Sequence, residues 1–288
     1  MRHFLSKLHP FDILVYSYVI VIIFILAIFG DITGIAGYHI LILIGYLILV
    51  TATINYLNHY TKGWQSFVRR AYPLLTILFL YEQSGLFINI IFPEFFDYQI
   101  IIFERSILGF NPTIALQTLY NPILNEILYL CYYSYFFFIP VISLYLYFNR
   151  RYFEFEKLIT VSCLAFYISY ITFILYPVEG PRYALAEMYW MKPAGYLFVP
   201  LVNQVINFGG LHGGCMPSSH IAVAITSTLI AYKYARTLFP FYLTFTIGLM
   251  IGTVWGRFHY VSDGIAGIIV AIISYIISEK ITNRHNQR

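Results

Sequence analysis

The chain has 288 residues, of which 60% are hydrophobic and only 10% are charged. A soluble domain carries roughly 25% charged residues, so this composition excludes a water-soluble globular protein. The mean hydropathy of +0.73 instead indicates an integral membrane protein. The net charge of +4 is small, and we interpret it as a topology signal that implies no nucleic-acid partner.

Apolar runs long enough to cross a bilayer occur eight times. A bilayer core about 30 Å thick needs about 20 apolar residues in a helix. The runs lie near residues 12–30, 38–57, 71–92, 123–148, 158–177, 219–236, 239–258 and 262–279. Few residues separate the last two runs, which predicts a tight helical hairpin. We therefore predict an all-α, polytopic membrane helix bundle of about eight transmembrane helices in a single domain.

Basic residues predict how this bundle is oriented. With eight spans, 13 of the 17 lysine and arginine residues fall on one side of the membrane. Only Arg105, Arg182, Lys192 and Arg257 fall on the other side. Because loops rich in lysine and arginine stay inside, we expect both termini to be cytoplasmic. The opposite side then faces the periplasm, the extracellular space or a lumen.

Two segments on the predicted outer side differ from simple loops. Residues 96–122 mix apolar and polar side chains at helical spacing, and residues 183–210 are rich in tyrosine, tryptophan and phenylalanine. Both patterns favour helices that lie along the membrane interface.

The three cysteines do not form a recognisable framework. Cys131, Cys163 and Cys215 are scattered and odd in number, and the chain has no C-x-x-C motif. We therefore expect neither a disulfide framework nor a zinc site, and we predict no metal or cofactor.

The first polar cluster on the predicted outer side is HGGCMPSSH, residues 212–220. Ser218 and Ser219 can cap the free amides of the following helix, whose N-terminus favours an anion. Gly214 lets the backbone approach a ligand closely, and His220 can supply a proton. The alternative is an ordinary capped helix with an interfacial histidine.

The second cluster is GRFHYVSDG, residues 256–264. His259 and Asp263 are four residues apart and are neighbours if the helix continues. A carboxylate on one imidazole nitrogen makes the other nitrogen a better nucleophile or base. Arg257 offers a guanidinium group for phosphate or carboxylate oxygens. The alternative is a salt-bridged hairpin turn.

The third cluster is YPVEGPRYA, residues 176–184, which contains Arg182. Alone, this arginine could simply hold lipid headgroups at the interface. The predicted topology, however, places all three clusters on the same side of the membrane. Together they supply cations for phosphate oxygens, a nucleophile with its orienting carboxylate, and a general acid. This combination favours metal-free phosphoryl transfer.

The three clusters resemble the membrane-bound type 2 phosphatidic acid phosphatase superfamily. GPR at 180–182, PSSH at 217–220 and HYVSD at 259–263 match its order and spacing, from about residue 95 onwards. Arg257, two residues before the histidine, is most similar to the inositol phosphorylceramide synthase-like branch. The resemblance implies a six-helix catalytic core over 93–288, with 1–92 as accessory helices.

The same resemblance implies a role for each site residue. His259 is the nucleophile that forms a phosphohistidine, Asp263 orients it, and His220 protonates the leaving oxygen. The residues implied to hold the phosphate are Arg182, Ser218, Ser219, Arg257 and Gly214.

The sequence departs from the family pattern at three positions. No lysine lies between Lys157 and Arg182, Thr253 stands where the family has an arginine six residues before the nucleophile, and Ser219 replaces a common glycine. If the helix continued to Arg257, this arginine would lie one turn from Thr253 and could bind the same phosphate.

These features predict an enzyme that cleaves a lipid phosphate or phosphodiester at the outer leaflet. Attack by water would make it a phosphatase, whereas attack by an alcohol acceptor would make it a phosphotransferase. A non-catalytic headgroup binder or transporter is the alternative from another class. Glu82 and Gln83, predicted to lie midway along run 71–92, favour an internal hydrogen-bond role over a functional one. The oligomeric state is left open.

Overall fold

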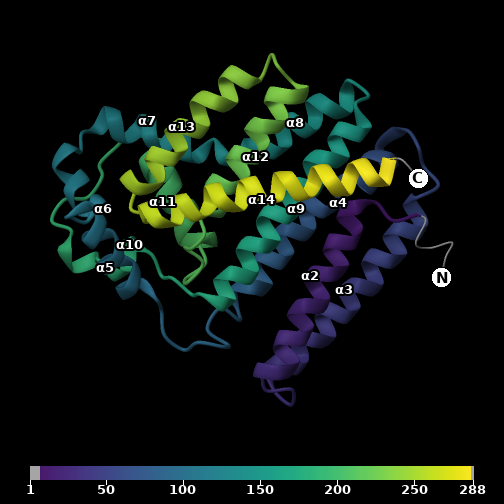
Figure 1. The fold of residues 1–288 in the computed structure, drawn as a ribbon, viewed down its shortest axis with the longest axis horizontal. Helices are drawn as coiled ribbons and strands as arrows, with labels where there is room; N and C mark the ends of the chain where they lie inside the picture. The colour runs from purple at the N-terminus through teal and green to yellow at the C-terminus, as the bar shows by residue number, and fades with distance from the viewer. Residues whose placement is uncertain (1–6, 287–288) are drawn as a thin grey trace.

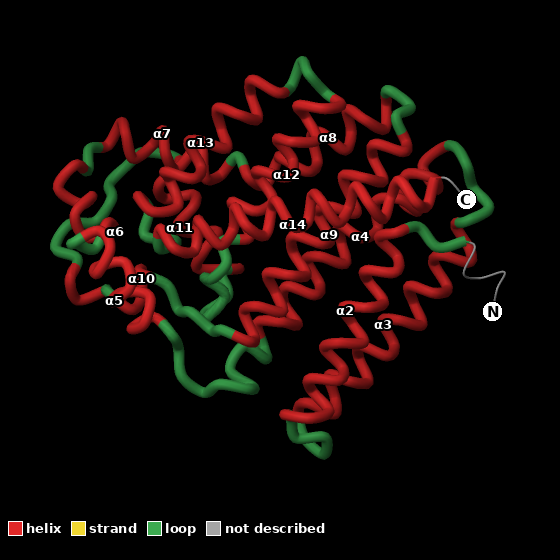
Figure 2. The backbone as a smooth tube through the Cα atoms, viewed as in Figure 1, coloured by secondary structure: helices red, strands yellow, loops and turns green. Residues whose placement is uncertain are grey.

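The protein is a bundle of α-helices, and the computed structural model describes residues 7–286 (Figures 1 and 2). The described residues contain no β-strand, so the predicted all-α fold is confirmed. The longer helices are α2 (Pro10–Phe29), α3 (Ile35–Leu57), α4 (Gly63–Gly85), α7 (Pro122–Tyr133), α8 (Tyr135–Phe148), α9 (Tyr152–Leu175), α12 (Ser219–Tyr234), α13 (Phe239–Trp255) and α14 (Val261–Asn286). The shorter helices are α5 (Asp97–Leu108), α6 (Pro112–Ala115), η1 (Leu116–Leu119), α10 (Pro181–Ala184), η2 (Ala186–Met188) and α11 (Phe198–Gly209).

Fewer of these helices can cross a membrane than the eight apolar runs predict. By length and hydropathy, four described helices qualify, namely α2, α3, α9 and α14, or five if the pair α7 and α8 forms one span. The other runs fall short because α12 has only 16 residues and α13 only 17, while the N-terminal half of α4 is polar and includes Arg69 and Arg70. Large apolar side chains such as Phe24 and Leu41 remain exposed on α2 and α3, as expected where lipid surrounds a helix. The chain is therefore an integral membrane protein, with fewer qualifying spans than predicted.

The run at 123–148, which we predicted as one span, forms two helices, and the pair is either one broken span or a re-entrant loop. α7 and α8 meet at an angle of 45°. Ser134 lies at the break, and its hydroxyl donates to the carbonyl of Cys131 at 2.6 Å. Such a local side-chain hydrogen bond competes with the helical backbone pattern.

The predicted hairpin of the last two runs is wrong. α13 packs against α7 and α12, whereas α14 packs against α12 and α9. The chain changes direction between them at Arg257, whose φ of 62° is left-handed. This conformation ends the regular helix and sends α14 to the far side of α12.

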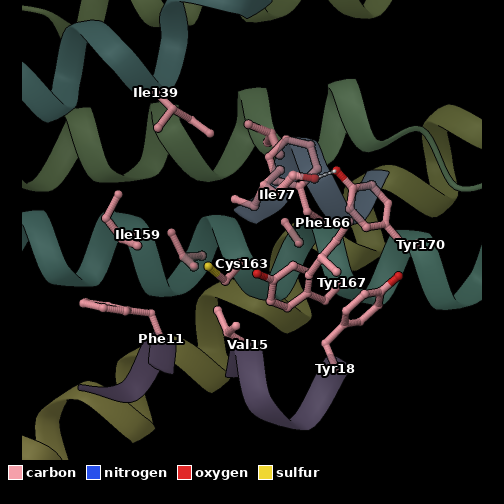
Figure 3. Packing of buried hydrophobic residues seen from close by; sticks show 14 of the residues in the cluster. Phe11, Val15, Tyr18, Ile77, Ile139, Ile159, Cys163, Phe166, Tyr167 and Tyr170 are labelled. Atoms are coloured by element: carbon pink, nitrogen blue, oxygen red, sulfur yellow. Dashed lines mark hydrogen bonds between the residues drawn. The ribbon is translucent and has the colours of Figure 1, made fainter. Parts of the chain in front are cut away.

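The core is built around α9 and α12. Figure 3 shows Val15 of α2 near Cys163 of α9, and Tyr18 of α2 beside Tyr167, on whose ring it stacks. α12 packs against α8, α9, α13 and α14. The N-terminus of α12, which carries the PSSH motif, is therefore fixed by several neighbouring helices.

Ion pairs join several helices at one end of the bundle. Arg69 of α4 pairs with Asp12 of α2 at 2.5 Å, and Lys157 of α9 pairs with Glu279 of α14 at 2.9 Å. Lys233, at the end of α12, also pairs with Glu279. The segments that carry the three polar clusters follow α9, precede α12 and precede α14, and thus lie at the opposite end. This separation agrees with the grouping of loops that the basic residues predict.

The side of the membrane on which each end lies can be tested by cysteine labelling. We expect cysteines replacing Phe110 and Trp190, both exposed at the end that carries the polar clusters, to react in intact cells with a membrane-impermeant reagent. Cysteines replacing Lys62 and Arg236 should react only after permeabilisation. The measurement needs a background in which the three native cysteines are serine, with that background as the control. Labelling of Lys62→Cys and Arg236→Cys in intact cells would reverse the predicted orientation.

Candidate active site

The PSSH motif forms the start of α12, as predicted. Ser218 is the N-cap, and its hydroxyl accepts a hydrogen bond from the amide of Ile221 at 3.4 Å. The amide of Ser218 donates to the carbonyl of Asp263 at 2.9 Å. This backbone contact joins the N-terminus of α12 to the first turn of α14, where the second polar cluster lies.

Backbone contacts also join the segment that carries Arg182 to the glycine-rich loop. The amide of Val178 donates to the carbonyl of Gly213, and the amide of Cys215 donates to the carbonyl of Val178, both at 3.0 Å. Gly180 has φ 100°, and a Cβ there would lie 2.9 Å from the sulfur of Cys215. Only glycine fits this position without strain. The three polar clusters are therefore in contact with one another.

A chain of hydrogen-bond contacts connects the two histidines. The Nδ1 atom of His259 lies 3.4 Å from Oδ2 of Asp263. The Nε2 atom of His259 lies 3.3 Å from Nδ1 of His220, whose Nε2 lies 3.0 Å from the hydroxyl of Tyr132. One assignment of protons satisfies every contact: Tyr132 donates to His220, His220 to His259, and His259 to Asp263. In this arrangement, the electron pair on Nε2 of His259 accepts the hydrogen bond from His220.

Asp263 has a second side-chain partner that the sequence did not reveal. The thiol of Cys215 donates to Oδ2 of Asp263 at 2.9 Å, and the amide of Tyr260 donates to the same oxygen at 2.7 Å. Burial, and then the charge of Asp263, raise the pKa of the Cys215 thiol well above its ordinary value. The thiol therefore stays protonated and acts as a donor.

Cys215, His259 and Asp263 also meet the geometric requirement for a metal site. One ligand atom from each residue, with the three atoms within 4.8 Å of one another, could hold an ion. The same three atoms are those that contact one another through hydrogen bonds. A bound ion and this hydrogen-bond arrangement are mutually exclusive, so removal of metal discriminates between them.

The two histidines line a cavity of about 580 Å³ together with Arg182, Ser219 and Gly214. The Nη1 atom of Arg182 is buried and has no hydrogen-bond partner among the described residues. A buried donor without a partner costs free energy unless a ligand satisfies it. Arg182 is therefore the cation best placed to bind an anion beside the histidines.

Arg257 and Ser218 are not brought to this cavity. The guanidinium of Arg257 lies 3.7 Å from the ring centre of Tyr189, and its Nε donates to the hydroxyl of Tyr120 at 3.1 Å. It also donates to the carbonyl of Met191. α13 ends at Trp255, so Arg257 does not share a helical face with Thr253 as the sequence analysis supposed. The roles of Arg257 and Ser218 in phosphate binding stay predictions that this geometry does not support.

Asp97 is a site-building residue that the sequence analysis missed. Its buried carboxylate accepts the amides of Glu179 at 2.7 Å and Gly180 at 2.8 Å, and the hydroxyl of Tyr260 at 2.9 Å. It thus connects the segment of Arg182 to the residue that follows His259. A carboxylate at the start of a predicted interfacial helix was the only signal in the sequence, and such a signal indicates no more than a favourable helix terminus.

We expect Asp97→Asn to reduce catalytic efficiency, kcat/KM, by about 10–100-fold. Asparagine has one acceptor oxygen and places an amide group against existing donors, so the Arg182 segment shifts relative to His259. The control is Asp31→Asn, because Asp31 also accepts a loop amide, that of Thr33, but in the loop between α2 and α3. Equal kcat/KM for the Asp97 and Asp31 variants, at equal melting temperature in detergent, would contradict a positioning role.

Comparison with known proteins identifies a family. No curated protein and no solved structure matches the chain significantly. The family model described as the PAP2 superfamily matches residues 98–277. This match covers more than half of the chain and includes Arg182, His220, His259 and Asp263, which the structure brings to one end of the bundle. The chain therefore belongs to the PAP2 superfamily.

Proposed function

We propose that the protein is a metal-independent lipid phosphatase or phosphotransferase that acts at the outer leaflet through a phosphohistidine intermediate. Membership of the PAP2 superfamily supports a phosphatase-type activity in general. The observation that supports the specific mechanism is the contact chain from Tyr132 through His220 and His259 to Asp263. Arg182 lines the same cavity, and its Nη1 atom has no partner among the described residues.

In the proposed first step, Nε2 of His259 attacks the phosphorus atom of the substrate. Burial and the neighbouring His259 lower the pKa of His220 to about 3, so His220 takes up a proton from water only beside the anionic phosphate. An N–P bond then forms while the bond between phosphorus and the leaving oxygen breaks, and His220 gives this proton to that oxygen. Asp263 stabilises the positive charge that develops on His259. The substrate phosphoryl group takes the place of His220 as the partner of Nε2 of His259.

In the second step, water or an alcohol attacks the phosphohistidine. His220, now neutral, accepts the proton of the attacking hydroxyl, the N–P bond breaks, and His259 is regenerated. The hydroxyl of Tyr132 suits both states of His220, because it donates to the neutral ring and accepts from the protonated ring. Arg182 binds phosphate oxygens in both steps.

The cavity wall supports a lipid substrate. Beyond the histidines, the cavity is lined by apolar side chains that include Ile77 and Phe79 of α4, Phe136 of α8 and Phe166 of α9. Phe136 is also exposed on the outer surface of the bundle. We infer that an acyl chain lies along this wall while the phosphate reaches Arg182, with the tail remaining in the outer leaflet.

Transfer to an alcohol is the second candidate reaction, as the likeness to the inositol phosphorylceramide synthase-like branch suggests. The supporting observation is a carboxylate, Glu82, in the same cavity wall. A carboxylate can accept a hydrogen bond from a hydroxyl group of an acceptor.

The two histidines should respond differently to the quality of the leaving group. His259→Ala should abolish both turnover and covalent trapping of phosphate. His220→Ala should slow turnover by about 10²–10⁴-fold with an alkoxide leaving group. Much of this loss should be recovered with a nitrophenyl phosphate substrate, because nitrophenolate leaves without a proton.

The measurement is a comparison of single-turnover rates for an alkyl and a nitrophenyl phosphate, with trapped phosphate counted by mass spectrometry. His212→Ala is the matched control, because His212 is an exposed histidine of the same loop that pairs with Glu179. Rescue of His259→Ala by nitrophenolate, without rescue of His220→Ala, would assign the two roles the other way round.

Removal of metal tests the chemistry of Cys215, His259 and Asp263 directly. We expect the purified protein to keep its activity in EDTA, because a hydrogen-bonded His259 needs no ion to present Nε2. Phosphate release from a panel of lipid phosphates, with and without EDTA, measures this. Complete loss of activity that a single divalent ion restores would show that the three residues hold a metal.

A further inference from the structure

The cavity that contains the histidines extends beyond the region that matches the family. Residues of α4, among them Ile77, Tyr81 and Glu82, form part of its wall, whereas the family match begins at residue 98. Contacts hold α4 in place at this end: the amide of Leu211 donates to the hydroxyl of Tyr81 at 3.2 Å. The family motifs therefore do not predict the part of the cavity wall that α4 forms.

Glu82 and Gln83 lie in the last turn of α4, because the helix ends at Gly85 and not near residue 92 as the apolar run predicted. They are therefore near the same end of the bundle as the histidines, not midway along a span. Gln83 has an internal hydrogen bond, as predicted, with its Oε1 atom 2.9 Å from Nδ1 of His39. Glu82, by contrast, is among the residues that line the cavity.

Glu82 has no compensating partner among the described residues. The other carboxylate in the cavity wall, that of Glu179, is engaged by His212 at 2.7 Å. Glu82 makes no hydrogen bond or ion pair within residues 7–286 and stands at the negative end of a helix, where a carboxylate is unfavourable. The side chain of Glu82 is exposed, so it needs no partner for stability, and it has no evident stabilising role in the fold. It lines the same cavity as Arg182, whose Nη1 atom has no hydrogen-bond partner within residues 7–286.

We propose that Glu82 binds a hydrogen-bond donor, an ammonium or a hydroxyl group, of the molecule whose phosphate lies at Arg182 or of the alcohol that accepts this phosphate. This inference rests on the proposed function and specifies its substrate class. An ionised carboxylate only accepts hydrogen bonds, so the ligand must supply the donor. Arg182 and Glu82 then bind opposite kinds of group, which favours a phosphodiester with a donor-bearing headgroup over a lipid that carries phosphate alone.

Three lipids with the same acyl chains test this inference. Phosphatidylethanolamine offers an ammonium group, phosphatidylglycerol offers hydroxyl groups, and phosphatidylmethanol offers no donor beyond its phosphate. For each lipid, kcat/KM is measured with the wild-type protein, with Glu82→Gln and with Glu82→Leu. Glutamine keeps a neutral acceptor, and leucine removes it. The matched control is Glu94→Gln, because Glu94 is an exposed acid that follows α4 in the chain and does not line the cavity.

We expect wild type to prefer at least one donor-bearing lipid over phosphatidylmethanol, and Glu82→Leu to reduce this preference by about tenfold or more. If the donor is an ammonium, Glu82→Gln loses the preference as well. If the donor is a hydroxyl, Glu82→Gln keeps part of it. If the donor belongs to the acceptor, the lipid preferences stay constant, and Glu82→Leu instead lowers the ratio of transfer to hydrolysis when glycerol is supplied.

The inference is overturned if Glu82→Leu changes neither the lipid preference nor the transfer ratio, even if it lowers kcat/KM equally for all three lipids. Failure of the proposed function has a different signature, namely a wild-type protein that turns over none of the lipids. Binding of the same three lipids, measured by native mass spectrometry, then still tests Glu82. A binding preference that Glu82→Leu does not alter would again overturn the inference.

Discussion

The candidate site depends on one buried carboxylate, that of Asp97 at the start of α5. It connects α5 to the loop that follows α9 and to the loop that precedes α14, which no shared helix or sheet holds together. Its oxygens accept the amides of Glu179 and Gly180 and the hydroxyl of Tyr260. In a membrane helix bundle, polar side chains are concentrated in the loops at the ends of the helices. The amides of these loops lack the hydrogen bonds of a helix or sheet and need other acceptors. Burial and the neighbouring Asp97 raise the pKa of Tyr260, so its hydroxyl stays a donor. Asp97 therefore fixes the distance between the arginine and the histidine on which the proposed chemistry relies.

Much of this site could be predicted from the sequence because the relevant signals are local. The spacing of His259 and Asp263 and the capping character of PSSH required no knowledge of the fold, and both contacts are present. The placement of the three clusters at one end followed from counting apolar runs and basic residues. This grouping holds although fewer helices qualify as spans than were counted, because short helices such as α12 still carry the chain from one end of the bundle to the other.

The remaining features could not be predicted because they depend on backbone geometry and on distant packing. Arg257 was assigned to the phosphate on the assumption that a helix continues through it, but α13 ends at Trp255 and Arg257 adopts a left-handed φ. Its guanidinium then stacks on Tyr189, a residue of a segment far away in the sequence. The hairpin prediction failed for the same reason, since the same turn separates α13 from α14. Asp97 gave only the signal of a helix terminus and Cys215 gave none, because each acquires its partners only when loops from different parts of the chain meet.

In the contact chain through the histidines, each residue donates a hydrogen bond toward Asp263. The residues at its two ends, Tyr132 and Asp263, determine this order of donors and acceptors. Oδ2 of Asp263 accepts the thiol of Cys215 and the amide of Tyr260, and both of these donors favour an ionised carboxylate. His259 must then donate from Nδ1, which leaves Nε2 as an acceptor toward His220. At the other end, the hydroxyl of Tyr132 can donate or accept. His220 can therefore gain or lose a proton, while the tautomer of His259 stays the same. A nucleophile with a constant tautomer beside an imidazole that can gain and lose a proton is the division of labour that phosphoryl transfer through a phosphohistidine requires.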